Sequence, residues 1–292
     1  MSLLTRTDGA HAIRTGRAST AVAVAFMILA ACYMLLPVYW LLVAATKSQG
    51  DLVDTPGLRP AHWHFGANLA ALFRQQDGVF ARWLLNSLLY AGAGAAVATA
   101  LSAAAGYALA KYRFPGRELL FSVILGGVLV PATALALPLF LMFAAADATN
   151  TFWSVFLPSV VSPFGVYLSR VFAAASVPDE VIEAARMDGA GELRIFTGIA
   201  VRMMSPALVT VFLFQFVVIW NNFLLPLVML QDDHLYPVTL GLYTWQTQTS
   251  RLPVLQTLTL VGALVSVVPI VLTFLLLQRY WRAGLSAGAV KS

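Results

Sequence analysis

The sequence predicts an all-α, polytopic membrane protein with six transmembrane helices. Of its 292 residues, 60% are hydrophobic and 11% are charged, and the mean hydropathy is +0.80. A soluble protein of this size would need many more charged residues to cover its core. A helix needs about 20 apolar residues to cross a bilayer. Six segments reach that length, near 20–46, 83–110, 119–142, 152–173, 206–230 and 256–278.

These segments divide the chain into successive regions. Five of the six contain no Asp, Glu, Lys or Arg, and the exception, Arg170, lies near one end of the fourth. The predicted regions are an N-terminal arm (1–19), a first transmembrane helix (20–46), a loop (47–82), a core of five transmembrane helices (83–278) that includes a charged loop at 176–205, and a tail (279–292).

The distribution of Lys and Arg predicts the orientation in the membrane. Thirteen of these residues lie in the arm, the second-to-third loop, the fourth-to-fifth loop with its flanks, and the tail: Arg6, Arg14, Arg17, Lys111, Arg113, Arg117, Arg170, Arg186, Arg194, Arg202, Arg279, Arg282 and Lys291. Five lie on the opposite side: Lys47, Arg59, Arg74, Arg82 and Arg251. Because cytoplasmic loops carry the excess of Lys and Arg, both termini and loop 176–205 are predicted to be cytoplasmic and loop 47–82 extracytoplasmic. The pI of about 9.6 therefore reflects topology, and no nucleic-acid partner is expected.

The first transmembrane segment has an alternative interpretation. Residues 29–32, Leu-Ala-Ala-Cys, follow an arginine-bearing arm as a lipoprotein processing site would. However, the apolar run continues from Tyr33 through Leu42, whereas a cleaved signal would be followed by polar sequence. This continuation favours an uncleaved membrane span. Cys32 is the single cysteine, so no internal disulfide is expected.

The loop between the fourth and fifth spans is predicted to contain a short amphipathic helix. Ser176 precedes Asp179 by three residues, which is the capping-box spacing and predicts a helix that begins at Val177. Pro178 falls in the first turn, and Gly189 is suited to end the helix. One stripe at helical spacing is apolar (Pro178, Val181, Ile182, Ala185) and another is charged (Asp179, Glu183, Arg186). Such a helix is suited to docking into a partner.

This loop resembles the EAA loop of binding-protein-dependent ABC importer permeases. The family pattern is Glu-Ala-Ala, three residues, Gly, nine residues, Ile, one residue, Leu-Pro. Matching residues at the right spacing are Glu183, Ala184, Ala185, Gly189 and Ile199. Val201 and Arg202 stand where Leu-Pro is usual, and a proline follows only at Pro206. This departure affects the expected geometry of the chain where it enters the fifth span, and not the identity of the loop.

Three further segments resemble the carbohydrate-uptake, maltose-permease-like subfamily. Residues 107–116 (YALAKYRFPG) are similar to the exit of the second span, residues 220–226 (WNNFLLP) to the fifth-span signature, and residues 284–291 (GLSAGAVK) to the C-terminal ending. The resemblance implies a type I ABC importer permease fold in the inner membrane of a prokaryote. It also implies a second permease, two ABC ATPase subunits and an extracytoplasmic solute-binding protein as partners, besides a sugar substrate and membrane lipid.

The chain is not expected to be an enzyme. It has no G-x-x-x-x-G-K-[ST] phosphate loop and no plausible catalytic triad or carboxylate pair, so ATP and Mg are expected on partner subunits, and no cofactor or metal on this chain. The alternative is a self-sufficient secondary carrier or channel, but the central portions of the spans lack the ionisable groups that such pathways use. A third interpretation, a membrane scaffold without transport, does not explain the EAA-like loop.

The resemblance implies that the 176–205 loop couples transport to the ATPase. The implied coupling residues are Asp179, Glu183, Ala184, Ala185, Arg186, Asp188, Gly189 and Ile199. Glu183 would make charged contacts, Ala184 and Ala185 would permit close approach, and Gly189 would turn the chain back. Beyond the turn, a stripe at helical spacing is expected to face the bundle: Leu193, Phe196, Ala200 and Met203.

The substrate path is predicted from polar and aromatic residues within or at the ends of spans. The candidates are Asn86, Trp220, Asn221, Asn222 and Gln256, with Ser87 and Gln215 as further members. Aromatic faces and amides suit sugar rings and hydroxyl groups. The same side chains also form hydrogen bonds between neighbouring helices, so this structural alternative stays open. The outer loop 231–253, with Tyr243, Trp245, Gln246 and Gln248, is a candidate contact for the binding protein.

Overall fold

The computed structural model describes residues 17–288, and every regular element within that range is a helix. Helices η1 and η4 are 3₁₀ turns and η2 and η3 are π-helical segments. The elements are, in order, α1 (Arg17–Thr46), α2 (Gln49–Asp54), α3 (Phe65–Arg74), η1 (Gln75–Gly78), α4 (Val79–Leu88), η2 (Leu89–Ala93), α5 (Gly94–Lys111), α6 (Arg117–Val128), α7 (Ala132–Ala145), α8 (Phe152–Ser159), α9 (Pro163–Ser176), α10 (Asp179–Met187), α11 (Glu192–Ile195), η3 (Phe196–Ala200), α12 (Val201–Met203), α13 (Ser205–Trp220), α14 (Leu224–Met229), η4 (Asp233–Leu235), α15 (Val238–Thr247) and α16 (Val254–Gly288).

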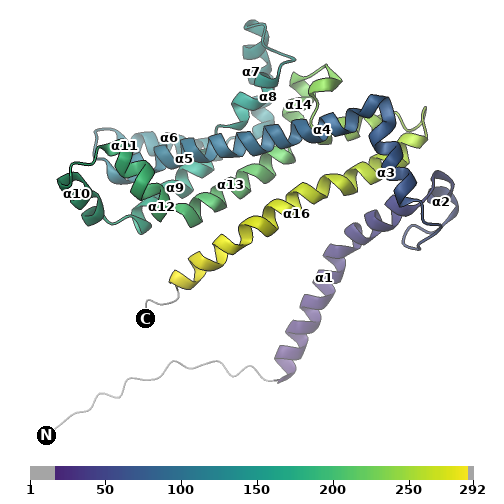
Figure 1. Ribbon diagram of the computed structural model, residues 1–292, viewed down its shortest axis with the longest axis horizontal. Coiled ribbons are helices and arrows are strands. Elements are labelled where there is room, and N and C mark those ends of the chain that lie inside the picture. The colour runs from purple at the N-terminus through teal and green to yellow at the C-terminus, as the bar shows by residue number, and fades with distance from the viewer. Residues whose placement is uncertain (1–16, 289–292) are drawn as a thin grey trace.

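The helices form an elongated bundle with two distinct ends (Figure 1). Helices α5, α9, α13 and α16 run lengthwise, and α5 packs against α9 and α13 while α16 packs against α13 and α15. Helices α10, α11 and α12 gather at one end, and α2, α3 and α4 lie at the other. Helix α1 extends away from the bundle, and its buried residues are confined to its last turn, Val43–Ala45. We call the end with α10 the loop end.

Two apolar clusters hold the bundle together. The larger lies towards the α3–α4 end, where the rings of Trp83 and Trp245 are 4.7 Å apart and Phe80 stacks on Trp245. The smaller lies at the loop end and joins α5, α9, α10 and α13 through Tyr107, Ala173, Ile182 and Leu208. Many other apolar side chains are exposed, as expected where lipid rather than water surrounds a helix. The two clusters therefore hold different ends of the bundle together, and α5 and α13 contribute to both.

The described residues contain four helical stretches long and apolar enough to cross a membrane, or up to six if each of two bent pairs counts as one span. The four are 19–46, 65–111, 152–176 and 254–278. The bent pairs are α6 with α7, at 102°, and residues 192–203 with α13, at 81°. The predicted all-α architecture agrees with this arrangement. The predicted six spans agree with the upper count, in which each bent pair is one span.

The predicted third span, 119–142, is wrong as a single helix. Helix α6 ends at Val128, and α7 begins at Ala132 after a sharp bend. Pro131 explains the break, because proline has no N–H to donate and disfavours the helical conformation at the residue before it. The turn before it is closed by backbone hydrogen bonds to Gly126 and Gly127. The apolar segment 119–142 is therefore two helices that run in different directions.

Other boundaries also differ from the prediction. The fifth span was expected at 206–230, but α13 ends at Trp220 and a separate helix, α14, begins at Leu224. Asn222 separates the two, because its Oδ1 accepts a hydrogen bond from the Leu225 N–H at the start of α14. Asparagine favours such local bonds over continued helix.

The regions expected outside the core are more helical than predicted. The loop 47–82 contains α2 and α3 and the start of α4. Helix α16 continues to Gly288, through most of the predicted tail 279–292. Arm residues 1–16 and tail residues 289–292 lie outside the described residues, so those parts of the prediction stay predictions.

Candidate functional site

Helix α10 forms at the loop end as a short helix with charged termini. Asp179 and Glu180 lie in its first turn and Arg186 in its last, which matches the polarity of a helix dipole. The predicted capping box is wrong, because Ser176 still belongs to α9 and Val177 is extended. Pro178 occupies the position before the helix, and no side chain caps it. The helix therefore begins two residues later than predicted.

Gly189 ends this segment as the sequence predicts. Its φ is +77°, a left-handed conformation that glycine adopts without the steric cost paid by other residues. The Gly189 N–H donates to the Arg186 carbonyl, and the Ala190 N–H donates to the Ala185 carbonyl. These bonds satisfy carbonyls that the end of α10 would otherwise leave open. The chain then turns back towards the bundle.

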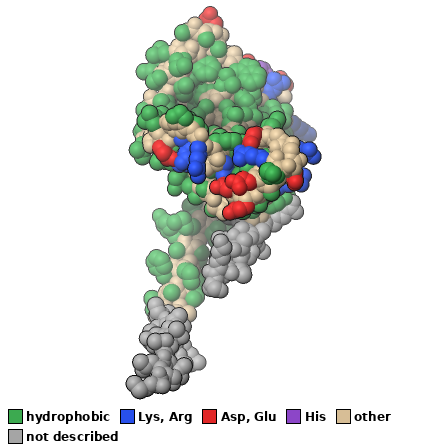
Figure 2. Space-filling model, turned by 90° about the vertical axis from the view of Figure 1, so that its left-hand side faces the viewer, with side chains coloured by type: hydrophobic (Ala, Val, Ile, Leu, Met, Phe, Trp, Pro, Cys, Tyr) green, Lys and Arg blue, Asp and Glu red, His purple; other side chains and the backbone are tan. Residues whose placement is uncertain are grey.

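The two faces of α10 have different environments. Ile182 and Ala185 are buried in the smaller apolar cluster. Glu183 and Ala184 are exposed, as are Arg186 and Asp188. Ile182 and Ala185 thus pack against the chain's own bundle, whereas the apolar stripe to which both belong was expected to dock into a partner. The exposed side presents several charged side chains together with Ala184 and Met187, which is 88% exposed. Figure 2 looks onto this end, where acidic and basic side chains gather.

Both ends of α10 form ion pairs. Lys111 Nζ, at the end of α5, donates to Asp179 Oδ1 at 2.8 Å. Arg186 Nε donates to Glu192 Oε1 at 2.7 Å, and the Tyr112 hydroxyl donates to Glu192 Oε2 at 2.5 Å. Glu192 therefore bridges α10 and the residue that follows α5.

These contacts shift the acidity of the groups involved. The hydrogen bond from Lys111 lowers the pKa of the Asp179 carboxyl below its ordinary value. The hydrogen bonds from Arg186 and then Tyr112 lower the pKa of Glu192. Burial raises the pKa of Tyr112, and the hydrogen bond to the Glu192 carboxylate raises it further, to about 12. The two carboxyl groups are therefore anions and Tyr112 is a neutral donor at neutral pH.

The chain beyond Gly189 packs against the bundle, but in part with different residues than expected. Ala200 is fully buried, and Phe196, Ile199 and Met203 pack against the smaller cluster. Leu193 was expected on the same stripe but is 76% exposed. Leu193 lies in α11, before the π-helical segment at 196–200, whereas Phe196, Ala200 and Met203 keep the inward side across that segment.

Most of the predicted path residues have partners inside the bundle. The Asn86 amide donates to the carbonyls of His234 and Tyr236, and Ser87 Oγ accepts from the Val238 N–H. The Gln215 amide donates to the Ser159 carbonyl. These contacts fit the structural alternative, hydrogen bonding between segments of the bundle.

The Trp220–Asn222 segment is only partly available to a solute. Trp220 is buried and stacks on Phe216, with ring centroids 5.6 Å apart. The Asn221 amide donates back to the Val217 carbonyl but the residue is exposed, while Asn222 is half-buried. Asn221 therefore remains the most accessible amide of this segment.

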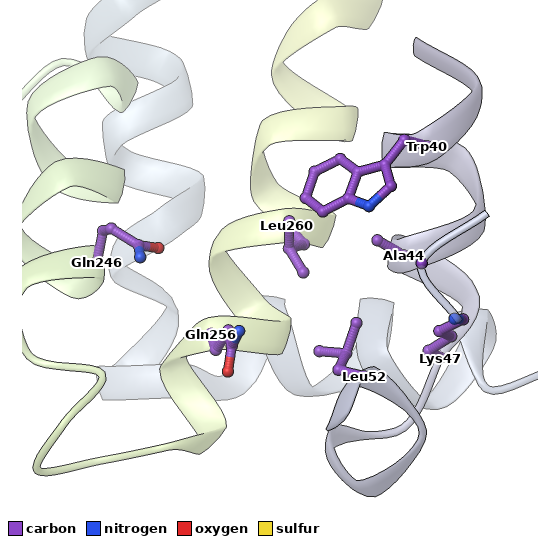
Figure 3. A pocket seen from close by; sticks show the side chains of 8 residues that line it. Trp40, Ala44, Lys47, Leu52, Gln246, Gln256 and Leu260 are labelled. Carbon is purple, nitrogen blue, oxygen red and sulfur yellow. The ribbon is translucent and has the colours of Figure 1, made fainter. Parts of the chain in front are cut away.

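Gln256 lies apart from the other predicted path residues. It lines a cavity of about 220 Å³ between the end of α1, the segment after it, α15 and the start of α16 (Figure 3). Trp40, Lys47 and Gln246 also line this cavity. Lys47 is 1% exposed, and its Nζ donates to the Pro56 carbonyl at 2.8 Å. The five predicted path residues thus do not form one cluster.

In the predicted binding-protein contact at 231–253, the aromatic residues separate. Tyr243 is exposed, whereas Trp245 is buried and donates from its indole to Gln76 Oε1 at 3.0 Å. Trp245 therefore stabilises the α3–α4 end.

Sequence reasoning missed three residues that hold the loop end together, Lys111, Tyr112 and Glu192. The first two belong to the exit segment 107–116, which resembles that of the carbohydrate-uptake permeases, but nothing in the local sequence pattern indicates their partners. Those partners lie 68 and 80 residues further along the chain. Only the fold brings them together.

Comparison with known proteins identifies the family. Residues 98–285 match the family described as binding-protein-dependent transport system inner membrane component. The chain is 36% identical to the arabinooligosaccharides transport system permease protein AraQ of Halalkalibacterium halodurans over 74% of this chain and 76% of that protein. It is 30% identical to the diacetylchitobiose uptake system permease protein NgcG of Streptomyces coelicolor over 96% of this chain and 92% of that protein.

The fold agrees with this assignment. The structure superposes on a chain of a bacterial ABC transporter involved in the import of the acidic polysaccharide alginate, with a TM-score of 0.79, 20% sequence identity, and coverage of 91% of this chain and 99% of that chain. The predicted importer-permease fold is therefore confirmed, and a self-sufficient carrier or channel is not favoured. The chain belongs to the family of inner membrane components of binding-protein-dependent transport systems, as a multi-pass permease subunit of an ABC importer.

Proposed function

We propose that this permease carries a sugar or oligosaccharide across the inner membrane in a complex with a second permease, two ATPase subunits and an extracytoplasmic binding protein. The names of the two relatives, which concern an arabinooligosaccharide and diacetylchitobiose, support the substrate class. A polyol or glycerophosphodiester is the competing cargo. ATP and Mg belong to the ATPase subunits in this proposal, because this chain has no phosphate loop.

The proposal assigns ATPase docking to the exposed face of α10. The observation that carries it is the division of this helix: Ile182 and Ala185 anchor it in the bundle, while Glu183 and Ala184 face outward. A helix held on one side by its own core and free on the other can transmit the movement of a partner into the bundle. Any such effect is a difference in docking free energy between two bundle states.

The proposed orientation places the loop end and both termini in the cytoplasm. The excess of Lys and Arg in the segments assigned to that side supports it. The ion pairs of Lys111, Arg170 and Arg186 add support, since they all lie near the exits of α5, α9 and α10. The α2–α3 end would then meet the binding protein.

The test is recovery of the complex from native membranes. The tagged chain is purified in mild detergent, and its partners are identified by mass spectrometry. We expect a second permease and an ATPase, and we expect Glu183→Lys to lose the ATPase while it retains the second permease. Glu180→Lys is the matched control, because it makes the same charge reversal at an exposed carboxylate of the same helix that is not among the proposed coupling residues.

Two results would count against the proposal. Recovery of the chain alone or with copies of itself would contradict the importer complex and favour a self-sufficient secondary carrier. Unchanged ATPase recovery in Glu183→Lys would remove α10 as the docking element. Uptake of labelled oligosaccharides, polyols and glycerophosphodiesters by cells with and without the gene then identifies the cargo.

A further inference from the structure

The two ends of α10 are held by two consecutive residues at the exit of α5. Lys111, the last residue of α5, binds Asp179 in the first turn of α10. Tyr112, the next residue, reaches the last turn of α10 through Glu192, which accepts from both Tyr112 and Arg186. We call these contacts the exit clamp: Lys111–Asp179 and Tyr112–Glu192–Arg186. The clamp attaches the whole length of α10 to one point of the bundle.

The residues of the clamp differ in how freely they can move. The Lys111 side chain is 8% exposed, whereas the Asp179 side chain is 73% exposed. Tyr112 is half-buried, and its ring makes an edge contact with Tyr107 at 5.9 Å between centroids. The α5 side of the clamp is therefore fixed in the bundle. The α10 side is solvent-facing and follows the helix.

The exit of α5 is also tied to the neighbouring helices. Arg117, at the start of α6, donates to the Tyr112 carbonyl at 3.3 Å, and the adjacent Glu118 accepts two hydrogen bonds from Arg170 of α9. The Arg170 guanidinium lies 3.9 Å from the centre of the Phe121 ring, a cation–π contact. Displacement of the α5 exit therefore acts on α6 and α9 as well.

Helices α5 and α9 are in such close contact that they must move as a unit. A Cβ added at Gly106 would lie 2.5 Å from Ser169 Cβ, and one added at Gly165 would lie 2.5 Å from Ser102 Oγ. Backbones that approach this closely interlock and cannot slide without a clash. A force delivered to α5 is thus passed on to α9 along their shared length.

We propose that Lys111, Tyr112 and Glu192 are positioning residues that transmit the movement of α10 into the α5–α9 pair. This inference rests on the proposed docking of an ATPase at α10 and names the route by which docking reaches the bundle. Exposed ion pairs add little to stability. Their role here is geometric: they set which part of the bundle moves when α10 moves. Ile182 and Ala185 would hold α10 in place even without them.

The test measures hydrogen exchange in the purified complex with and without a non-hydrolysable ATP analogue. In the wild type, we expect the analogue to change the exchange of α10 and of the last turns of α5. In Tyr112→Phe and in Glu192→Gln, the change in α10 should persist, while the change in α5 should fall about fivefold or more, the usual lower range of a coupling between sites. Both substitutions keep the size of the side chain, and Glu180→Gln should behave as the wild type.

A charge exchange adds a test that simple destabilisation would not pass. Lys111→Glu should abolish the response of α5, and addition of Asp179→Lys should restore at least half of it. A failure of rescue, together with a normal α5 response in Tyr112→Phe and Glu192→Gln, would overturn the clamp while leaving docking at α10 intact. If the analogue leaves α10 itself unchanged in the wild type, the proposed function fails, and the clamp fails with it.

Discussion

The backbone of Gly106 in α5 lies directly against Ser169 in α9. A Cβ at position 106 would lie 2.6 Å from the Arg170 backbone nitrogen as well as 2.5 Å from Ser169 Cβ. A backbone atom cannot swing away as the end of a long side chain can. The contact therefore requires glycine, and it joins the two helices next to the exit clamp.

Gly106→Ala should destabilise the protein by about 1–3 kcal/mol, the range for overpacking a filled interior. Gly126→Ala is the matched control, because Gly126 is also helical and has no atom within 4 Å of an added Cβ. Thermal unfolding in detergent should show a lower midpoint for the first variant and an unchanged or higher one for the second. Equal midpoints would mean that an added Cβ at position 106 meets no obstacle in α9, and so that α5 and α9 are not in backbone contact there.

Gly189→Ala should loosen the end of α10. The φ of +77° costs a residue with a Cβ roughly 1–2 kcal/mol, and an added Cβ has no neighbour within 4 Å, so strain alone is tested. Hydrogen exchange in residues 179–191 should rise. Gly191→Ala, at an ordinary φ of −71°, should leave exchange as in the wild type. If both variants behaved alike, the left-handed turn would not limit this segment.

Asn86→Ala should lower stability rather than affinity for the solute. Its amide makes two hydrogen bonds to carbonyls of the 234–236 segment, at 2.8 and 3.0 Å, and truncation leaves both acceptors without it. The expected cost is about 1–3 kcal/mol in unfolding. Asn221→Ala loses only a local bond to the Val217 carbonyl, in the last turn of α13, and serves as the control. A normal unfolding midpoint in Asn86→Ala with a raised KM for uptake would instead place Asn86 in the path.

The Lys111–Asp179 contact should persist on mild acidification. The folded-state pKa of Asp179 is lowered, so its stabilising contribution is fully present above the ordinary carboxyl pKa of about 3.9. It is lost only as pH falls further, through the folded value. The difference in unfolding midpoint between wild type and Asp179→Asn should therefore be the same at about pH 8 and about pH 5. A difference that vanishes by pH 5 would contradict the lowered pKa.

At the loop end, the local sequence pattern predicted some features of α10 and the segment after it but not others. The stop at Gly189 followed from the sequence, because its left-handed turn depends on one residue type. Helical spacing grouped Ile182 with an apolar stripe, but that stripe was expected to dock into a partner, and Ile182 packs into the chain's own bundle instead. The start of the helix did not follow from the sequence, because Ser176 remained in α9 and left the proposed cap unformed. Leu193 was expected to face the bundle on the same stripe as Phe196, but the structure leaves it exposed.

The membrane spans show the same limit on a larger scale. Hydropathy located the apolar segments because a bilayer demands about 20 consecutive apolar residues whatever the fold. It could not show that the third segment bends by 102° at Pro131, since an apolar run looks alike whether straight or broken. Nor could it separate residues that line a path from those that join helices, as Asn86 and Gln215 do.

The sequence by itself determined the solvent, the helical class, the family resemblance and the loop with Glu183 and Gly189. These follow from composition and short-range spacing, which act before any tertiary contact forms. The tertiary structure alone decided that Ala185 turns inward and that Lys111 and Tyr112 hold opposite ends of α10. The physical reason is distance along the chain: contacts across 68 and 80 residues depend on how whole helices pack, which no local pattern specifies.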